Sequence, residues 1–315
     1  MKAQFFMAPL IQAGNLFAWH LLFKHRDIGN RIPVLCYHRV LPDLIEGRVP
    51  LYTVLPEQFE AQMAFLAAAD FNSLSLEEYA EIARGRRPLV KRGVLVTFDD
   101  GYADNYAMAW PIAQKYQIKI NLFICTGSVG QAHPIFMAPD GYAVSPHRPA
   151  LMEDRTDLKN HLRHFPHLWR PLTWEEIRKM QHSGVEIGFH SHRHRKLALL
   201  PPEEIATDIA TGLEVFAREL GYRPKFFALP YGWYDSYTPE VIRTLQRFNL
   251  QLIFATHLDR APLPSDAWIF PRIVVLQQDN LATFQRKLFG AHDWPAHLRR
   301  LKNLTQVLGE KPRPW

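Results

Sequence analysis

The stretch GVLVTFDDGYADNY, residues 93–106, decides the expected fold. It begins with an apolar, β-branched run, which is typical of a strand buried on both faces of a parallel sheet. The run ends on two adjacent carboxylates, Asp99 and Asp100. Side chains of neighbouring strand residues point to opposite faces, but this geometry relaxes at a strand end, so both carboxylates can reach one cavity. Two close carboxylates repel unless a cation or a shared proton compensates them, so the pair indicates either a turn or a charged site.

Six other apolar runs resemble the one at 93–99, and helical patterns lie between them. The predicted strands are 32–38, 93–99, 119–126, 185–191, 225–231, 250–256 and 268–276, and the predicted helices are 56–69, 75–85, 173–184, 201–221 and 238–248. Repeated alternation of strand and helix predicts an α/β fold, with a parallel sheet inside and helices outside. Closing that sheet gives a (β/α) barrel of about seven strands. The functional site of such a barrel lies at the C-terminal ends of the strands.

The composition is that of an ordinary globular protein and constrains the partners only weakly. Of the 315 residues 47% are hydrophobic, and the formal net charge is +6. A basic balance suits an anionic partner, but no stripe of Lys and Arg interleaved with aromatic residues is present, so no nucleic-acid partner is expected. The two cysteines, Cys36 and Cys125, lie inside apolar runs and are predicted to be core residues. Nothing indicates a disulfide scaffold, which fits a reducing compartment.

The chain is expected to contain one main domain, residues 31–295, followed by a tail at 296–315. Residues 1–30 are apolar but interrupted, and no small-residue cleavage site follows them. They predict either a segment lying in a membrane interface or a helix packed on the domain, with a signal anchor as a third alternative. The expected location is the cytoplasm, with peripheral contact at the inner face of the cytoplasmic membrane. Residues 127–171 break the alternation and predict a long loop that acts as a lid or a substrate-binding element.

Chemically useful side chains gather where the predicted strands end. The segment GFHSHRH carries His190, His192 and His194. His190 and His194 are four residues apart, so they can converge with one carboxylate into a two-His, one-carboxylate metal site that leaves positions open for water and substrate. One cation needs only one Asp, so the second carboxylate is available as a general base. The alternative interpretation of this segment is a loop of solvated histidines.

Three motifs carry a resemblance to a known family. TFDDG (97–101), HSHRH (190–194) and LPYG (229–232) resemble the three leading motifs of the polysaccharide deacetylases, carbohydrate esterase family four, which have the NodB-homology fold. CYHRV (36–40) is similar to the first strand of exopolysaccharide-type members, and the resemblance covers roughly residues 31–290. It implies a distorted (β/α) barrel with one divalent metal, usually zinc and sometimes cobalt or nickel. It also implies hydrolysis of the N-acetyl group of a hexosamine.

The resemblance implies a role for each matching residue. Asp99 corresponds to the general base, and the backbone N–H of Tyr231, which follows Pro230, corresponds to the donor that meets the tetrahedral oxyanion. The implied metal ligands are Asp100, His190 and His194. Pro230, Tyr231 and His38 are expected at the substrate, whereas His192 is not expected to be a ligand.

Two departures from the family pattern affect the expected mechanism. Many members carry an Arg two residues before the Pro of the third motif, where this chain has Ala228. Arg272 is a candidate substitute that could orient the catalytic Asp, or it could form a structural pair at a strand end. The family's late motif brings a His as general acid, but the segment IVVLQQDN (273–280) has none. The alternative proton donors are His38, His257 and Asp279.

The expected substrate is a carbohydrate bearing an N-acetylhexosamine. The leading hypothesis is a lipid-linked or nucleotide-linked precursor on the way to lipopolysaccharide or exopolysaccharide. Two alternatives remain open: a deacetylase-like protein that binds glycan without turnover, and a deformylase of a formamido sugar. The sequence does not indicate an oligomeric state.

Overall fold

The computed structural model describes residues 29–42, 52–131, 167 and 170–290. The interpretations of the segment 1–30, of most of the loop 127–171 and of the tail 296–315 lie almost wholly outside these residues. Among the described residues, no helix combines the length and the apolar character that a membrane span requires.

Each of the seven predicted apolar runs contains at least one β-strand. The strands are β1 (Val34–Tyr37), β5 (Gly93–Phe98), β6 (Asn121–Ile124), β7 (Glu186–Phe189), β8 (Phe226–Ala228), β9 (Leu252–Ala255), β10 (Ile269–Pro271) and β11 (Ile273–Val274). The last run was predicted as one strand, but it forms two, with Arg272 between them. Three short strands were not predicted: β4 (Asn72–Leu74) pairs with β5, and β2 (Arg39–Val40) pairs with β3 (Thr53–Val54).

The parallel sheet is nearly closed into a barrel. Its strand order is β10-β9-β8-β7-β6-β5-β1-β11, with β4 pairing beside β5. Because only Arg272 separates β10 from β11, one chain segment pairs with β9 at its start and with β1 at its end. The backbone of Arg272 belongs to this closure, since its N–H donates to the carbonyl of Ala255 at 2.7 Å. The predicted (β/α) barrel is therefore confirmed.

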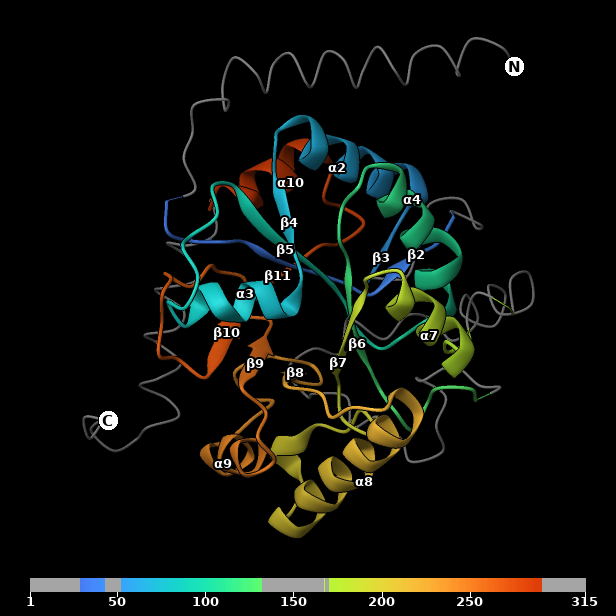
Figure 1. Ribbon diagram of the computed structural model, residues 1–315, viewed down its shortest axis with the longest axis vertical. Helices are drawn as coiled ribbons and strands as arrows, with labels where there is room; N and C mark the ends of the chain where they lie inside the picture. The colour runs from blue at the N-terminus through green and yellow to red at the C-terminus, as the bar shows by residue number, and fades with distance from the viewer. Residues whose placement is uncertain (1–28, 43–51, 132–166, 168–169, 291–315) are drawn as a thin grey trace.

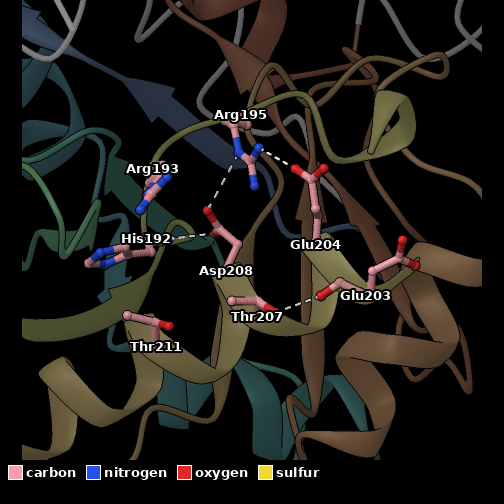
Figure 2. A pocket seen from close by; sticks show the side chains of 8 residues that line it. All are labelled: His192, Arg193, Arg195, Glu203, Glu204, Thr207, Asp208 and Thr211. Carbon is pink, nitrogen blue, oxygen red and sulfur yellow. Dashed lines mark hydrogen bonds and ion pairs between the residues drawn. The ribbon is translucent and has the colours of Figure 1, made fainter. Parts of the chain in front are cut away.

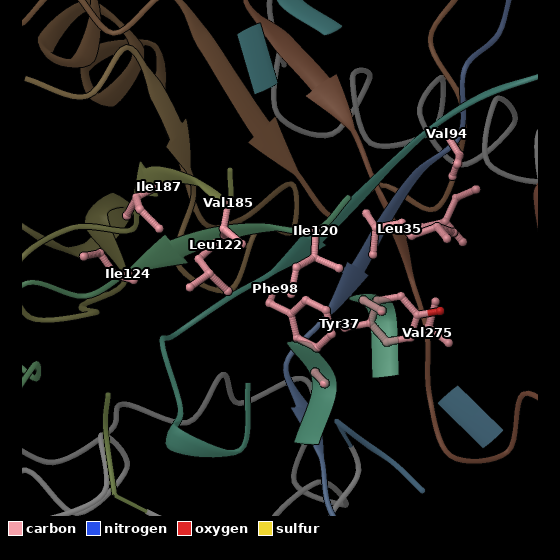
Figure 3. Packing of buried hydrophobic residues seen from close by; sticks show 14 of the residues in the cluster. Leu35, Tyr37, Val94, Phe98, Ile120, Leu122, Ile124, Val185, Ile187 and Val275 are labelled. Atoms are coloured by element: carbon pink, nitrogen blue, oxygen red, sulfur yellow. The ribbon is translucent and has the colours of Figure 1, made fainter. Parts of the chain in front are cut away.

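Side-chain alternation along the strands creates two apolar faces. In β5, Val94, Val96 and Phe98 belong to an outer cluster. This cluster includes residues of α2 (Pro56–Ala68), α7 (Trp174–His182), α8 (Pro202–Leu220), α9 (Pro239–Arg247) and α10 (Leu281–Leu288). Leu95 belongs to an inner cluster, with Phe254 of β9 and residues of α3 (Leu76–Ala83). Figure 3 shows part of the outer cluster, in which side chains from several neighbouring strands meet on one face. Because every second side chain of a strand points to the same face, this alternation determines which polar residues at the strand ends can point into the barrel.

Helices surround the sheet, and all five predicted ones are present (Figure 1). They are α2, α3, α7, α8 and α9. Within the described residues, the sequence did not predict three helical segments, one of which is the short 3-10 helix η4 (Leu197–Leu199). The π-helix η1 (Asn105–Ala109) runs directly into α4 (Trp110–Lys115), and α10 (Leu281–Leu288) packs against α2. A π-helical turn breaks the 3.6-residue period on which the sequence prediction depends.

Candidate active site at the C-terminal ends of the strands

Asp99 and Asp100 meet different neighbours because the backbone changes conformation between them. By alternation, Asp99 lies on the same face of β5 as Leu95, which points into the barrel. Asp100 has a φ of +74°, in the left-handed region that few non-glycine residues adopt, and Gly101 follows with a φ of +81°. This turn lets Asp100 reach the histidines that follow β7.

A guanidinium fork holds the Asp99 carboxylate. Arg272 Nη1 donates to Oδ1 at 2.7 Å and Nη2 donates to Oδ2 at 2.6 Å, while the Cys36 thiol donates to Oδ2 at 3.4 Å. Both side chains of the ion pair are buried. Burial tends to raise the pKa of the Asp99 carboxyl, but Arg272 and then His190 hold it below its ordinary value. Asp99 is therefore ionised at neutral pH, as a general base must be.

Removal of the fork is expected to destabilise the fold. Arg272→Met would leave the Asp99 charge buried without its main partner, and breaking a buried ion pair in this way costs about 3–5 kcal/mol in free energy of unfolding. Urea denaturation at neutral pH would measure the loss. The control is Arg243→Met, because the Arg243 side chain is 57% exposed beside Glu240, and its removal should cost about 0.5 kcal/mol or less. Equal losses in both variants would contradict a structural role for the fork.

Three of the predicted side chains converge beside this pair. Oδ1 of Asp100 lies 3.3 Å from Nε2 of His190 and 3.2 Å from Nε2 of His194, and all three residues are buried. The His190 ring also contacts the carbonyl of Ala228 through Nδ1 at 2.8 Å. Donation by Nδ1 to this carbonyl would fix the orientation of the ring and leave Nε2, which faces Asp100, as the nitrogen available to a metal.

The residues present fit a divalent cation. One ligand atom from each of Asp100, His190 and His194 lies within 4.8 Å of the other two. Oδ1 of Asp100 is buried and has no partner in hydrogen-bond geometry among the described residues, although both imidazoles are near it. Burial tends to raise the pKa of Asp100, but His194 and His190 hold it well below its ordinary value, so the carboxylate is ionised. Two imidazoles and one carboxylate form the donor set that zinc and related metals prefer.

The loop that carries both histidines is tightly constrained. Ser191 and His194 have φ values of +68° and +52°, and the Ser191 hydroxyl accepts the N–H of His194 at 2.9 Å. His192 points away from the cluster, and its Nδ1 lies 3.0 Å from the hydroxyl of Thr126. The backbone N–H of His192 donates to the buried carboxylate of Asp208, on α8, at 2.9 Å; this hydrogen bond is drawn as a dashed line in Figure 2. The structure thus gives His192 a place in the loop but not in the cluster.

Pro230 and Tyr231 follow β8 and lie beside the same cluster. The Tyr231 ring is 5.1 Å from the ring of His194, measured between centroids, and the Tyr231 backbone has a φ of +64°. Pro230 is buried. The third motif therefore meets the second at the C-terminal ends of neighbouring strands, as the sequence predicted.

His38 is the alternative proton donor that the fold places at the site. A ring nitrogen of His38 lies within 4.8 Å of both Asp99 and Cys36, and its Nδ1 is buried with no hydrogen-bond partner among the described residues. Burial lowers the pKa of His38 below its ordinary value, although the nearby carboxylates of Asp100 and Asp99 act to raise it. His257 instead stacks on Tyr234 with ring centroids 4.0 Å apart.

Asp279, the third alternative, is engaged elsewhere. It forms a buried ion pair with Lys287 and accepts the N–H of Leu276 at 2.8 Å. Sequence reasoning missed two groups that contact the site. The apolar run around Cys36 indicates only a core residue, and Asp208 lies in none of the motifs. A polar residue on the buried face of α8 is the signal that could have identified Asp208.

The fold and the site together define a class of protein. A parallel barrel that holds an Asp–His–His set next to an ionised, buried carboxylate, at the C-terminal ends of its strands, is suited to metal-assisted hydrolysis.

Comparison with known proteins gives the family. A model described as polysaccharide deacetylase matches residues 86–250, more than half of the chain. The chain therefore belongs to the polysaccharide deacetylase family, as the motifs predicted. It is 24% identical, over 78% of its own length and 71% of the relative's, to YxkH of Bacillus subtilis, which is named among the polysaccharide deacetylases. It is also 40% identical to poly-β-1,6-N-acetyl-D-glucosamine N-deacetylase of Staphylococcus aureus, over 25% of the chain and only 27% of that relative.

Solved structures share the fold. IcaB from Ammonifex degensii superposes with a TM-score of 0.64 at 26% identity, covering 83% of this chain and 98% of IcaB. The Streptococcus pyogenes deacetylase PplD, solved in complex with acetate, also gives a TM-score of 0.64, at 21% identity over 82% of this chain and 98% of PplD.

Proposed function

We propose that this chain is a metal-dependent N-deacetylase that hydrolyses the N-acetyl groups of a β-1,6-linked N-acetylglucosamine glycan. The observation that carries the proposal is the convergence of Asp100, His190 and His194 beside a carboxylate, Asp99, that Arg272 keeps ionised. A protein that only bound glycan would have no physical need to bury this charged cluster, so the geometry favours turnover over binding alone.

The chain's own residues can carry most of the chemistry. A divalent cation held by Asp100, His190 and His194 would supply Lewis acidity toward the amide carbonyl and water. Asp99 accepts the proton of the attacking water, and the Arg272 fork fixes the orientation of the accepting oxygens. The backbone N–H of Tyr231 donates to the oxyanion that develops on the former carbonyl oxygen.

His38 is the residue we assign to protonate the leaving nitrogen. The half-buried His38 has a ring nitrogen close to Asp99, whereas His257 stacks on Tyr234 and Asp279 pairs with Lys287. A neutral imidazole near Asp99 can receive from Asp99 the proton that the water releases and pass it to the departing amine. In this assignment His38 acts as the general acid, the role that the late-motif histidine has in the family and for which residues 273–280 offer no histidine.

The identity of the substrate rests on the relatives. The name of the Staphylococcus aureus protein specifies a β-1,6-linked N-acetylglucosamine polymer, and the IcaB structure aligns over most of this chain. These similarities favour a polymer over the lipid-linked or nucleotide-linked precursor that the sequence favoured.

The proposal is tested by measuring acetate release from β-1,6-linked N-acetylglucosamine oligomers, with β-1,4-linked oligomers and a nucleotide-linked N-acetylhexosamine as comparisons. We expect acetate from the β-1,6 series, loss of that activity after dialysis against a chelator, and its return when zinc, cobalt or nickel is added. Bound metal without acetate from any substrate would contradict turnover. Formate released from a formamido sugar in place of acetate would identify a deformylase.

A further inference from the structure

The segment that follows β8 leaves the regular strand ladder at the third motif. In the parallel pairing of β8 with β9, Ala228 lies opposite Phe254, and the N–H of Leu229 donates to the carbonyl of Phe254 at 2.9 Å. A regular ladder would continue with the N–H of Thr256 donating to the carbonyl of Leu229. Instead, Thr256 N–H donates to the carbonyl of Gly232 at 2.8 Å, three residues further along the chain.

The side chain of Thr256 makes a second contact with the same segment. Its hydroxyl donates to the carbonyl of Tyr231 at 3.0 Å, and Thr256 is only 5% exposed. Two consecutive carbonyls, those of Tyr231 and Gly232, therefore accept hydrogen bonds from one residue, Thr256, which directly follows β9. The approach is close: a Cβ at Gly232 would lie 2.7 Å from the Thr256 hydroxyl oxygen and 2.9 Å from its backbone nitrogen.

These contacts hold a backbone conformation that is otherwise unfavourable. Tyr231 and Gly232 have φ values of +64° and +66°, and the left-handed region is uncommon for a residue with a side chain. On the N-terminal side, the Pro230 ring restricts its own φ, and Leu229 is fixed in the ladder. Tyr231 is thus held on one side by the hydrogen bond of Leu229 to Phe254 and on the other by the two hydrogen bonds from Thr256.

We propose that Thr256 is a positioning residue that aims the backbone N–H of Tyr231 at the oxyanion. The inference rests on the proposed function, in which that N–H is the donor. A donor that is fixed before the reaction needs no reorganisation as charge develops, and misplacement by about 1 Å can cost roughly 10²-fold in rate. Thr256 acts through Tyr231 and does not itself touch the substrate.

The test uses two variants at Thr256 and a matched control. Thr256→Val keeps the shape but removes the hydroxyl, and Thr256→Ser keeps the hydroxyl. Thr244→Val, at a buried position on α9, controls for replacing a buried threonine. We expect Thr256→Val to lower kcat for acetate release by roughly 10- to 100-fold with little change in KM and in bound metal, while Thr256→Ser and Thr244→Val stay near wild type.

Amide hydrogen exchange of the segment 229–236 supplies a readout that does not depend on activity. Exchange in this segment should speed up in Thr256→Val and not in Thr256→Ser. Unchanged exchange and kcat in Thr256→Val would overturn the inference, as would equal damage in Thr256→Ser, which would indicate a packing role. If the wild type released no acetate from any glycan, the proposed function would fail. The role of Thr256 in positioning the oxyanion donor would fail with it. Exchange would then decide only whether Thr256 holds the segment.

Discussion

Asp99→Asn is expected to lower the rate of acetate release by roughly 10²–10⁴-fold, the range that a positioned general base contributes. The amide of Asn cannot accept the proton of water as a carboxylate can. The ligand set of Asp100, His190 and His194 is not altered, so metal content should stay near that of the wild type. Acetate release and metal content, measured on the same preparation, would check both expectations.

The same substitution removes the charge that pairs with buried Arg272, so some loss of stability is expected as well. Asp279→Asn is the matched control, because it breaks another buried ion pair, with Lys287, and Asp279 belongs to neither group of potential ligands found among the described residues. We expect both variants to unfold at lower urea concentration and only Asp99→Asn to lose activity. If Asp279→Asn lost activity to the same degree, a general loss of stability would explain both results, and Asp99 would not be the base.

The sequence predicted the scaffold well because buried parallel strands have a simple pattern. Continuous apolar runs located the strands at 93–99, 185–191 and 225–231, and every strand end that the motifs marked does lie at one end of the barrel. The run at 268–276 showed the limit of this reasoning. Its apolar pattern cannot reveal that the segment changes pairing partner at Arg272, because that change depends on closure of the whole sheet.

The site was predictable in composition but not in detail. The motifs predicted that Asp100 would meet the two histidines. They could not predict that its φ of +74° separates it from Asp99, since left-handed conformation in a non-glycine residue has no reliable sequence signal. The partners of Asp99 come from β1 and from the junction of β10 and β11, far away in sequence. The sequence predicts for Arg272 either orientation of the catalytic Asp or a structural ion pair at a strand end. Only the structure shows that the Cys36 thiol donates a hydrogen bond to Asp99.

The loop 190–194 offers an internal comparison between two histidines two residues apart. His194→Ala is expected to weaken metal binding by at least about 10²-fold, because loss of even an outer hydrogen-bonding partner of a metal ligand costs roughly 10–100-fold. His192→Ala is the matched control. The His192 side chain contacts Thr126 rather than Asp100, so its removal should leave metal affinity within a few-fold of wild type.

Competition against a chromophoric chelator would measure both affinities, and acetate release would follow the same order. The contrast is informative because both residues are histidines of one short loop. A general disturbance of that loop should affect the two variants alike, whereas direct ligation should affect only His194→Ala. Equal loss of metal in both would show that the constrained loop, rather than the His194 imidazole, determines the affinity. Full metal binding in His194→Ala would remove His194 from the ligand set and leave Asp100 and His190 as an incomplete site.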